Sequence, residues 1–196
     1  MTDTILNTRR NFLGKSAVTL SAAALLLLDG EEAKAAMASK KKGGGGGAGD
    51  VAILNVALGL EHEAINAYTL GAQSGLLSKP VLDVAVLFQS HHKGHRDALI
   101  ATINKLGGKP VAEKTLAQYA TELNAGSIKS ATDILQLAAR LELGAVNAYL
   151  GVIPSLGDKE LGKVAARLAA DETMHWTTLN AALGGSIPAA PLTFGA

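Results

Sequence analysis

The sequence predicts an all-α protein built on an antiparallel four-helix bundle. Four segments repeat apolar residues at helical spacing, and no stretch alternates convincingly with the two-residue period of a strand. Aromatic residues make up only 4% of the chain, whereas alanine, leucine and glycine are abundant, which suits closely packed helices. The phrases LEHEAINAY at 60–68 and LELGAVNAY at 141–149 share six identical positions, which indicates a duplicated helix pair.

The first 38 residues are predicted to be an export signal. Arg9 and Arg10 stand before Phe12, and an apolar run follows from 17 to 28. Two Ala-x-Ala cleavage sites come next, ending at Ala35 and at Ala38. The arginine pair followed by Phe-Leu resembles a twin-arginine signal. This resemblance implies the twin-arginine translocase as a partner during export, and a periplasmic or otherwise exported location.

The signal is not expected to leave the protein anchored in a membrane. Its apolar run is about a dozen residues long, whereas a helix that spans a bilayer needs about 20. Residues 39–50 contain three lysines and five consecutive glycines, and are predicted to form a flexible linker. The folded domain is therefore expected to begin near Val51.

The first two helices are predicted from their apolar period and from residues that start or end helices. The first runs from about 51 to 71, with Asp50 as its N-cap. The second starts after Pro80, a favoured helix-start residue, and runs to Leu106, where Gly107-Gly108 ends it.

The last two helices carry similar signals. The third is predicted to start after Ser130 and to reach about Ile153, where Pro154 ends it. The fourth runs from about 159 to 183 and ends at Gly184-Gly185. The first and second helices, and the third and fourth, are joined by short connections, so each pair is expected to be antiparallel.

The connection between the second and third helices is longer and spans 107–130, with a short helix expected at 115–123. It predicts a long crossover along the bundle. The bundle is expected to cover 51–185, followed by a C-terminal tail at 186–196.

Polar residues interrupt the apolar face that each helix is expected to turn inward. The predicted inward positions are 54, 58, 61, 65 and 68; 84, 88, 92, 95 and 99; 135, 138, 142, 146 and 149; and 161, 165, 168, 172, 175 and 179. An isolated buried carboxylate is costly, so these polar groups are expected to partner one another or to share a cation. The six groups are Glu61, His92, His95, Glu142, Glu172 and His175.

The chemistry of these groups favours certain metals. Carboxylate oxygen with imidazole nitrogen and no sulfur suits iron or manganese, with zinc or copper as further candidates. The chain contains no cysteine, which excludes a thiolate zinc site, an iron–sulfur cluster and a disulfide framework. A buried carboxylate–histidine network without metal is the alternative interpretation.

These motifs resemble the ferritin-like superfamily of di-metal carboxylate four-helix proteins, in particular its exported branch that includes desiccation-related proteins. The pattern of that family is one Glu from each of two helices and Glu-x-x-His from each of the other two. The resemblance implies that Glu61, Glu142, Glu172 with His175, and His95 are metal ligands. His92 stands where the pattern has a glutamate, and is included as a ligand.

The histidine at 92 changes the charge balance. Two divalent ions carry four positive charges, whereas the three glutamates supply three negative ones. The sequence is therefore compatible with one bound ion or with two, and with a weaker or asymmetric site.

Four further residues are predicted to support the site. The resemblance implies that Asp171 orients a ligand histidine. His91 either takes the corresponding place in the other half, which is the interpretation adopted, or is simply exposed. Tyr68 and Tyr149 are predicted to be core residues whose hydroxyl groups bond to the site. His62 and Glu63 lie off the inward face and are predicted to be solvated.

The sequence leaves two main functions open. The first is a metal-dependent oxidoreductase of ferroxidase or peroxide type, and the second is a non-catalytic, stress-related or structural protein with a degenerate or metal-free site. An interaction module with a vestigial polar core is a third. The formal net charge is +1 and the one basic cluster, at 40–42, has no aromatic neighbours, so no nucleic-acid binding is expected. A monomer or homodimer is expected.

Overall fold

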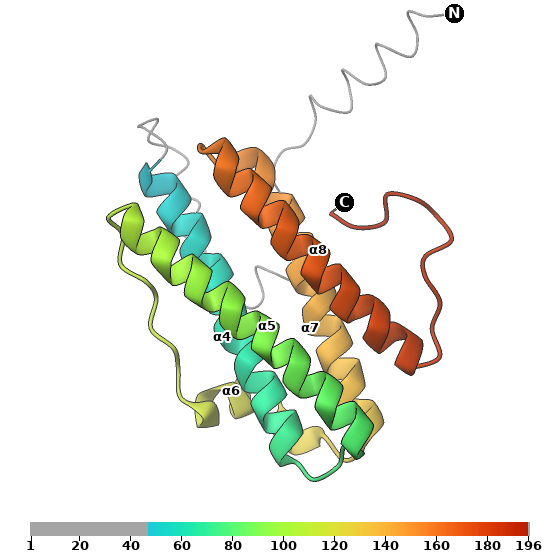
Figure 1. Ribbon diagram of the computed structural model, residues 1–196. Helices are drawn as coiled ribbons and strands as arrows, with labels where there is room; N and C mark the ends of the chain where they lie inside the picture. The colour runs from blue at the N-terminus through green and yellow to red at the C-terminus, as the bar shows by residue number, and fades with distance from the viewer. Residues whose placement is uncertain (1–46, 196) are drawn as a thin grey trace, which may run out of the picture.

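The computed structural model describes residues 47–195, and the predicted export signal lies outside this part of the chain. Four long helices form a bundle, and the described residues contain no strand (Figure 1). The helices are α4 (Gly47–Gln73), α5 (Lys79–Lys105), α7 (Ala131–Val152) and α8 (Lys159–Ala182). The predicted all-α bundle is therefore confirmed.

The two Gly-Gly pairs end α5 and α8 in the same way. Gly107 has a φ of 75°, and the Gly108 N–H donates to the Ile103 carbonyl at 2.9 Å. Gly184 has a φ of 83°, and the Gly185 N–H donates to the Asn180 carbonyl at 2.8 Å. A left-handed residue followed by this backward hydrogen bond is a Schellman motif, which glycine forms most readily.

The start and end of α7 follow from its sequence as predicted. The Ser130 hydroxyl accepts from the Asp133 N–H, and the Asp133 carboxylate accepts from the Ser130 N–H, which makes a capping box. Pro154 cannot continue the helix, and a 3₁₀ turn, η2 (Ile153–Ser155), follows.

The start of α4 differs from the prediction. The helix begins at Gly47, so the last four residues of the predicted linker are helical, and Asp50 is not its N-cap. The Asp50 side chain is buried and accepts hydrogen bonds from the N–H groups of Gly157 at 2.7 Å and Asp158 at 3.2 Å. Its carboxylate thus caps the connection to α8, and the prediction failed because this partner is distant in sequence.

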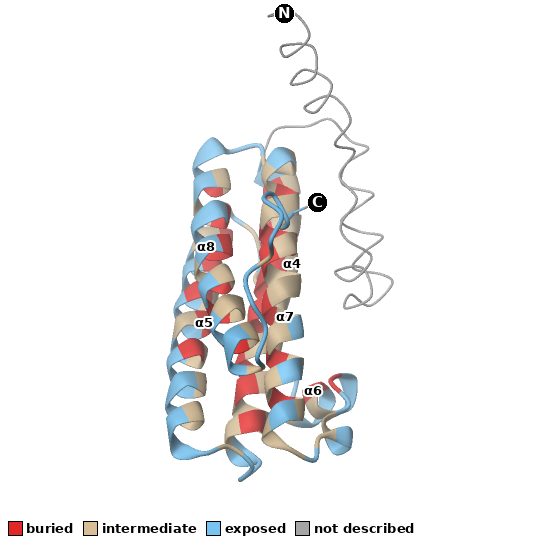
Figure 2. Ribbon diagram, turned by 90° about the vertical axis from the view of Figure 1, so that its right-hand side faces the viewer, coloured by how far each residue is buried: buried red, intermediate tan, exposed pale blue. Residues whose placement is uncertain are grey.

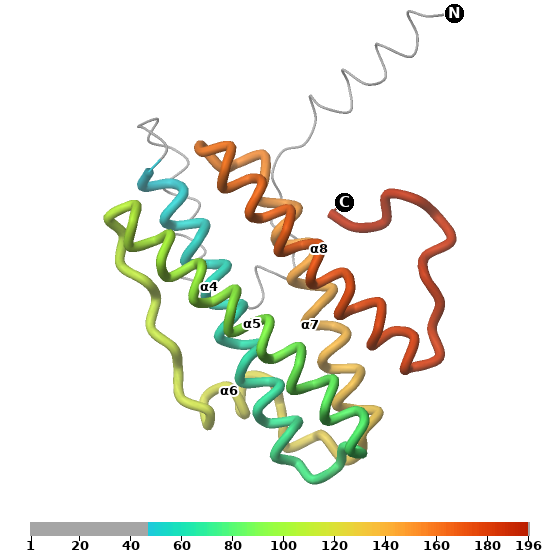
Figure 3. The backbone as a smooth tube through the Cα atoms, in the orientation of Figure 1, coloured from blue at the N-terminus to red at the C-terminus, as the bar shows by residue number. Residues whose placement is uncertain are grey.

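The long connection runs along the outside of α4 and returns the chain to the end of the bundle where α5 begins (Figure 3). It includes α6 (Leu116–Glu122) and the 3₁₀ turn η1 (Ala125–Ser127), so the short helix expected there is confirmed. The Asn55 side chain fixes its start by donating to the Lys109 carbonyl at 3.0 Å and accepting from the Val111 N–H at 2.7 Å. Because of this crossover, α5 and α7 run in the same direction.

The C-terminal tail turns back from α8 along the bundle (Figure 2). The Gly195 N–H donates to the Asn147 side chain at 2.8 Å, which ties the tail to α7. Within the described residues, no helix combines the length and apolar content that a membrane crossing needs.

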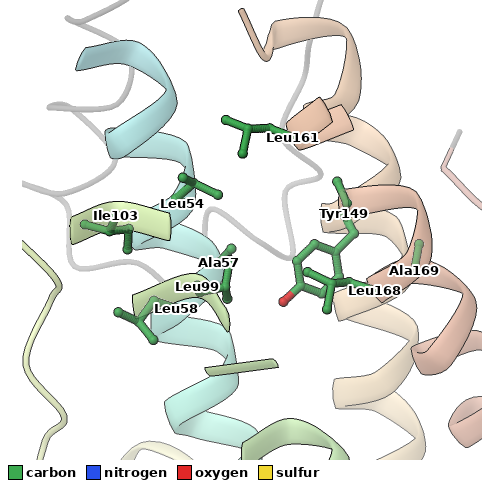
Figure 4. Close-up of a cluster of buried hydrophobic side chains, with 10 residues drawn as sticks. Leu54, Ala57, Leu58, Leu99, Ile103, Tyr149, Leu161, Leu168 and Ala169 are labelled. Atoms are coloured by element: carbon green, nitrogen blue, oxygen red, sulfur yellow. The ribbon is translucent and has the colours of Figure 1, made fainter. Parts of the chain in front are cut away.

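Buried side chains face the bundle interior and form two apolar clusters. The larger one lies toward the start of α4, and joins Leu58 and Ile103 on the α4–α5 side to Tyr149 and Leu168 on the α7–α8 side (Figure 4). The smaller one lies toward the other end and consists of Tyr68, Phe88, Ala138 and Leu179. Glu61 comes between Leu58 and Tyr68 along α4, so the polar residues of the core lie between the two clusters.

Two predicted inward residues are less buried than expected. Val84 is 37% exposed and Leu135 is half-buried. Both line an apolar cavity of about 250 Å³ at the end of the bundle where α5 and α7 begin. The helices do not close on one another there, which helical periodicity alone cannot reveal.

Candidate metal centre

The six polar residues of the inward faces meet in the middle of the bundle. They form two groups, in each of which one ligand atom per residue lies within 4.8 Å of the others. All six side chains are buried, and Glu172 is 0% exposed. The first group is Glu61, His92, His95 and Glu172, and the second is His92, Glu142, Glu172 and His175.

Glu172 and His92 belong to both groups and direct different atoms to each. Glu172 Oε1 lies 3.1 Å from His95 Nδ1, and its Oε2 lies 3.0 Å from His175 Nδ1. His92 Nδ1 lies 2.8 Å from Glu61 Oε2, and its Nε2 lies 3.2 Å from Glu142 Oε1. The two groups are therefore adjacent and share one carboxylate and one imidazole.

Each remaining histidine of the centre has a partner on its outer side. His95 Nε2 lies 3.1 Å from Asp171 Oδ2, and His175 Nε2 lies 2.9 Å from His91 Nδ1. Both histidines therefore direct Nδ1 inward and Nε2 outward. Such outer partners fix the orientation of a ligand histidine.

The two tyrosines bond to the glutamates in a crossed arrangement. The Tyr68 hydroxyl donates to Glu142, and the Tyr149 hydroxyl donates to Glu61. Each tyrosine thus holds the carboxylate of the other helix. The sequence predicted hydroxyls bonded to the site but did not indicate this crossing. Burial, followed by the charge of the neighbouring carboxylates, raises the pKa of both tyrosines, so both remain proton donors.

Phe88 is a further residue of the centre, although the sequence indicated only a core position for it. Its ring stacks on the His175 ring with centroids 4.1 Å apart, and packs edge-on against Tyr68 at 6.3 Å. Phe88 thereby lies between the centre and the rest of the smaller apolar cluster.

The pKa values of the three carboxylates shift in different directions, although all three groups are buried. Burial raises the pKa of Glu61, but hydrogen bonds with two histidines outweigh it and lower the pKa below its usual value. The same balance lowers the pKa of Glu142. For Glu172, burial prevails and the pKa is raised. Glu61 and Glu142 therefore favour the charged form that binds cations.

In this arrangement all three histidines of the centre favour their protonated form. Burial lowers the pKa of each, but hydrogen bonds and the charge of the carboxylates outweigh burial and raise it. The pKa of His95 is raised to about 10. A metal ion would take the place of these protons, because histidine binds metal through a neutral ring nitrogen.

The residues present fit a divalent metal ion. Three carboxylates and three imidazoles supply oxygen and nitrogen donors without sulfur, which is the donor set of iron and manganese sites. Outer partners orient two of the histidines, as in known metal sites. The structure brings all six predicted ligands together, whereas their binding of metal stays a prediction.

The side of α4 that faces the crossover holds residues that the sequence placed in solvent. His62 is 4% exposed, so that prediction is wrong. Its ring nitrogens have no hydrogen-bond partner among the described residues, and the nearest carboxylate oxygen, Glu113 Oε2, lies 3.9 Å from Nδ1. Asn66 donates to Glu113 Oε1 at 2.6 Å. The crossover covers this face, which a helical pattern within α4 cannot show.

Glu63, next to this covered face, should make stability depend on pH. Burial and the charge of Glu122 raise its pKa from 4.5 to about 7. Because the folded state holds the proton more tightly, its stabilising contribution is complete below pH 4.5 and is lost as the pH rises through 7. We expect Glu63→Gln to raise the free energy of unfolding at pH 8 by about 1–2 kcal/mol, allowing for partial solvent screening.

The measurement is urea unfolding of the wild type and the variant at pH 4.5 and pH 8. The gain should vanish at pH 4.5, where the wild-type carboxyl is protonated. Glu160→Gln, on an exposed side chain of α8, is the control for loss of a carboxylate and should not raise the free energy of unfolding at pH 8. An equal gain for Glu63→Gln at both pH values would exclude this explanation.

Comparison with known proteins supports the fold. A family model described as a ferritin-like domain matches residues 49–185, well over half of the chain. The crystal structure of a conserved hypothetical protein, rv2844, from Mycobacterium tuberculosis is similar, with a TM-score of 0.59 and 24% sequence identity over 76% of this chain and 97% of that chain. At this identity the likeness shows the fold alone. No curated protein matches the chain at a significant level.

Proposed function

The chain belongs to the ferritin-like domain family, and on that premise we propose that it is an exported protein that binds iron or manganese in the centre of its bundle. The observation that carries the proposal is the pair of buried four-residue groups that share Glu172 and His92. Glu61 and His95 would complete one ion's ligands, and Glu142 and His175 would complete the other's. His92 would be a ligand of only one of the two ions, because a neutral imidazole has a single unprotonated ring nitrogen.

The residues around the centre would perform three tasks for a bound ion. Tyr68 and Tyr149 hold Glu142 and Glu61 in place. Asp171 and His91 hold the ligand histidines. The apolar clusters on both sides exclude water from the ligands. Iron or manganese held there would supply one-electron chemistry with oxygen or peroxide, which is the activity we propose.

A second candidate function follows from His92. This residue replaces a carboxylate of the family pattern and bonds to Glu61 and Glu142 at once, so it already satisfies both. The centre would then serve as a structural network or as a site that retains metal without catalysis. Iron(II) added to metal-free protein in air separates the two functions, because only the first predicts oxidation faster than in buffer.

The decisive experiment is the metal content per chain of protein purified from the exported fraction. Mass spectrometry should find one or two equivalents of iron or manganese in the wild type, and a loss of this metal in the Glu61→Ala, Glu142→Ala double variant. If zinc or copper is found in the same amount, the six residues bind metal as proposed, but the metal is not iron or manganese. If the folded wild type contains no metal, even after iron(II) or manganese(II) is added, the proposal is wrong.

Export is tested separately. Replacing Arg9 and Arg10 with lysine should keep the protein inside the cell if the twin-arginine translocase carries it. Unchanged release after this substitution would contradict that route without bearing on the metal centre.

A further inference from the structure

The end of the bundle beside the metal centre is hollow. A cavity of about 250 Å³ lies among the C-terminal half of α4, the starts of α5 and α7, η1 and the end of α8. Every long helix contributes to its wall, so it is a hollow between the helices and not a face of one helix, and it opens to solvent beside Val84. The apolar cluster at the opposite end leaves a cavity of only about 20 Å³, so the core is much better filled there.

The wall offers few polar groups that could hold water. Its polar side chains are those of Tyr68 and Thr178, and both hydroxyls already donate, to Glu142 and to the Met174 carbonyl. The other lining side chains are aliphatic or aromatic, or glycine. A buried water needs two to four polar partners, so this cavity favours an apolar occupant.

The size of the cavity decides which apolar molecule fits. A cavity of about 150 Å³ accommodates benzene, so 250 Å³ corresponds to roughly ten carbon atoms. A helix with its side chains is about 10 Å across and cannot enter such a space. An unbranched chain can, because it is narrow and flexible enough to follow the gap between the helices.

We propose that this cavity binds one unbranched aliphatic chain of about ten carbon atoms. The inner part of the chain lies against Tyr68 and Phe88. Phe88 stacks on His175, and Tyr68 donates to Glu142, so the bound chain is one layer of aromatic rings away from the metal centre. The proposal does not rest on the function proposed for the centre, because no wall residue is a predicted ligand, although Tyr68 and Phe88 contact ligands.

The test is titration of the full chain, first treated with chelator and freed of bound lipid, with 1-alkanols from hexanol to hexadecanol. Isothermal titration calorimetry should show one molecule bound per chain, with the tightest binding near decanol. Affinity that keeps rising with chain length would indicate adsorption to the surface and would overturn the proposal. So would the absence of binding.

Variants locate the site. Ala85→Leu with Ala138→Leu adds side-chain volume to the wall and should weaken decanol binding at least tenfold. Ala98→Leu, on the exposed side of the same helix α5, is the matched control and should bind as the wild type does. If the double variant is not folded by circular dichroism, the chain-length profile of the wild type decides alone.

A second copy of the chain could also place a side chain in the cavity. In that case decanol would shift the protein from dimer to monomer on size-exclusion chromatography, and its apparent affinity would fall as protein concentration rises. This result, or equal decanol binding by the double variant and the wild type, would overturn the proposal.

Discussion

Glu172→Gln is expected to weaken metal binding strongly in both groups of the centre. Glu172 is completely buried and is the one carboxylate that the two groups share. Glutamine keeps the size of the side chain but removes its charge and one of its two acceptor oxygens. We expect metal affinity to fall by more than about 100-fold, which exceeds the usual effect of changing a residue that only orients a ligand.

Metal titration of Glu61→Gln tests whether Glu172→Gln loses affinity because both groups share Glu172. Glu61 belongs to only one of the groups, so its replacement should leave the second group able to bind. Calorimetric titration of chelator-treated protein with manganese(II) measures both variants. Glu160→Gln on the same helix as Glu172 is the control for charge, since its side chain is 80% exposed. A Glu172→Gln variant that binds as well as Glu61→Gln would contradict the shared role.

Metal-free Glu172→Gln should remain folded, which keeps this prediction testable. Burial raises the pKa of Glu172 and so favours its neutral form, which glutamine resembles. Thermal melting followed by circular dichroism checks this. A large loss of helical signal would mean that the carboxylate supports the fold in its charged form.

The helices and their ends could be predicted from sequence because their signals are local. The Gly-Gly pairs, the capping box of Ser130 and Asp133, and Pro154 act within one or two turns of their own positions. The six residues of the centre could also be predicted, because a polar residue on an apolar stripe is visible at helical spacing. Their common depth in four helices then places them together.

Other features depend on which distant segment packs where, and local patterns do not carry that information. The burial of His62 requires the crossover to cover α4, and the role of Asp50 requires the connection to α8 to lie beside the first turn of α4. The crossed bonds of Tyr68 and Tyr149 require α4 and α7 to be neighbours in one register. The exposure of Val84 reflects a cavity that helical spacing does not specify.

His92→Glu is expected to have opposite effects with and without metal. In the wild type, hydrogen bonds with Glu61 and Glu142 overcome burial and raise the pKa of His92, so its positive charge lies among the carboxylates. The substitution replaces that charge with a fourth carboxylate. Breaking a buried pair in this way costs about 3–5 kcal/mol, which lowers the melting temperature of the metal-free protein by roughly 10–15 °C.

Added iron(II) or manganese(II) should reverse the order of stability. Four carboxylates balance the charge of two divalent ions and restore the family pattern, so occupancy should rise toward two ions per chain and the melting temperature should recover. His92→Gln is the matched control: it removes the imidazole without adding charge, and should not raise occupancy. Mass spectrometry of the loaded proteins measures the ion count.

The ion count of His92→Glu shows what the histidine at position 92 does in the wild-type centre. If the glutamate variant gains an ion, the histidine limits the charge that the centre can neutralise, and the rest of the site still has the geometry of a two-ion centre. If the variant is folded and both it and the wild type hold one ion per chain, the spacing of the remaining five ligands sets the limit. The wild-type centre would then be a one-ion site in which His92 is a ligand in its own right, because it lies within reach of both glutamates.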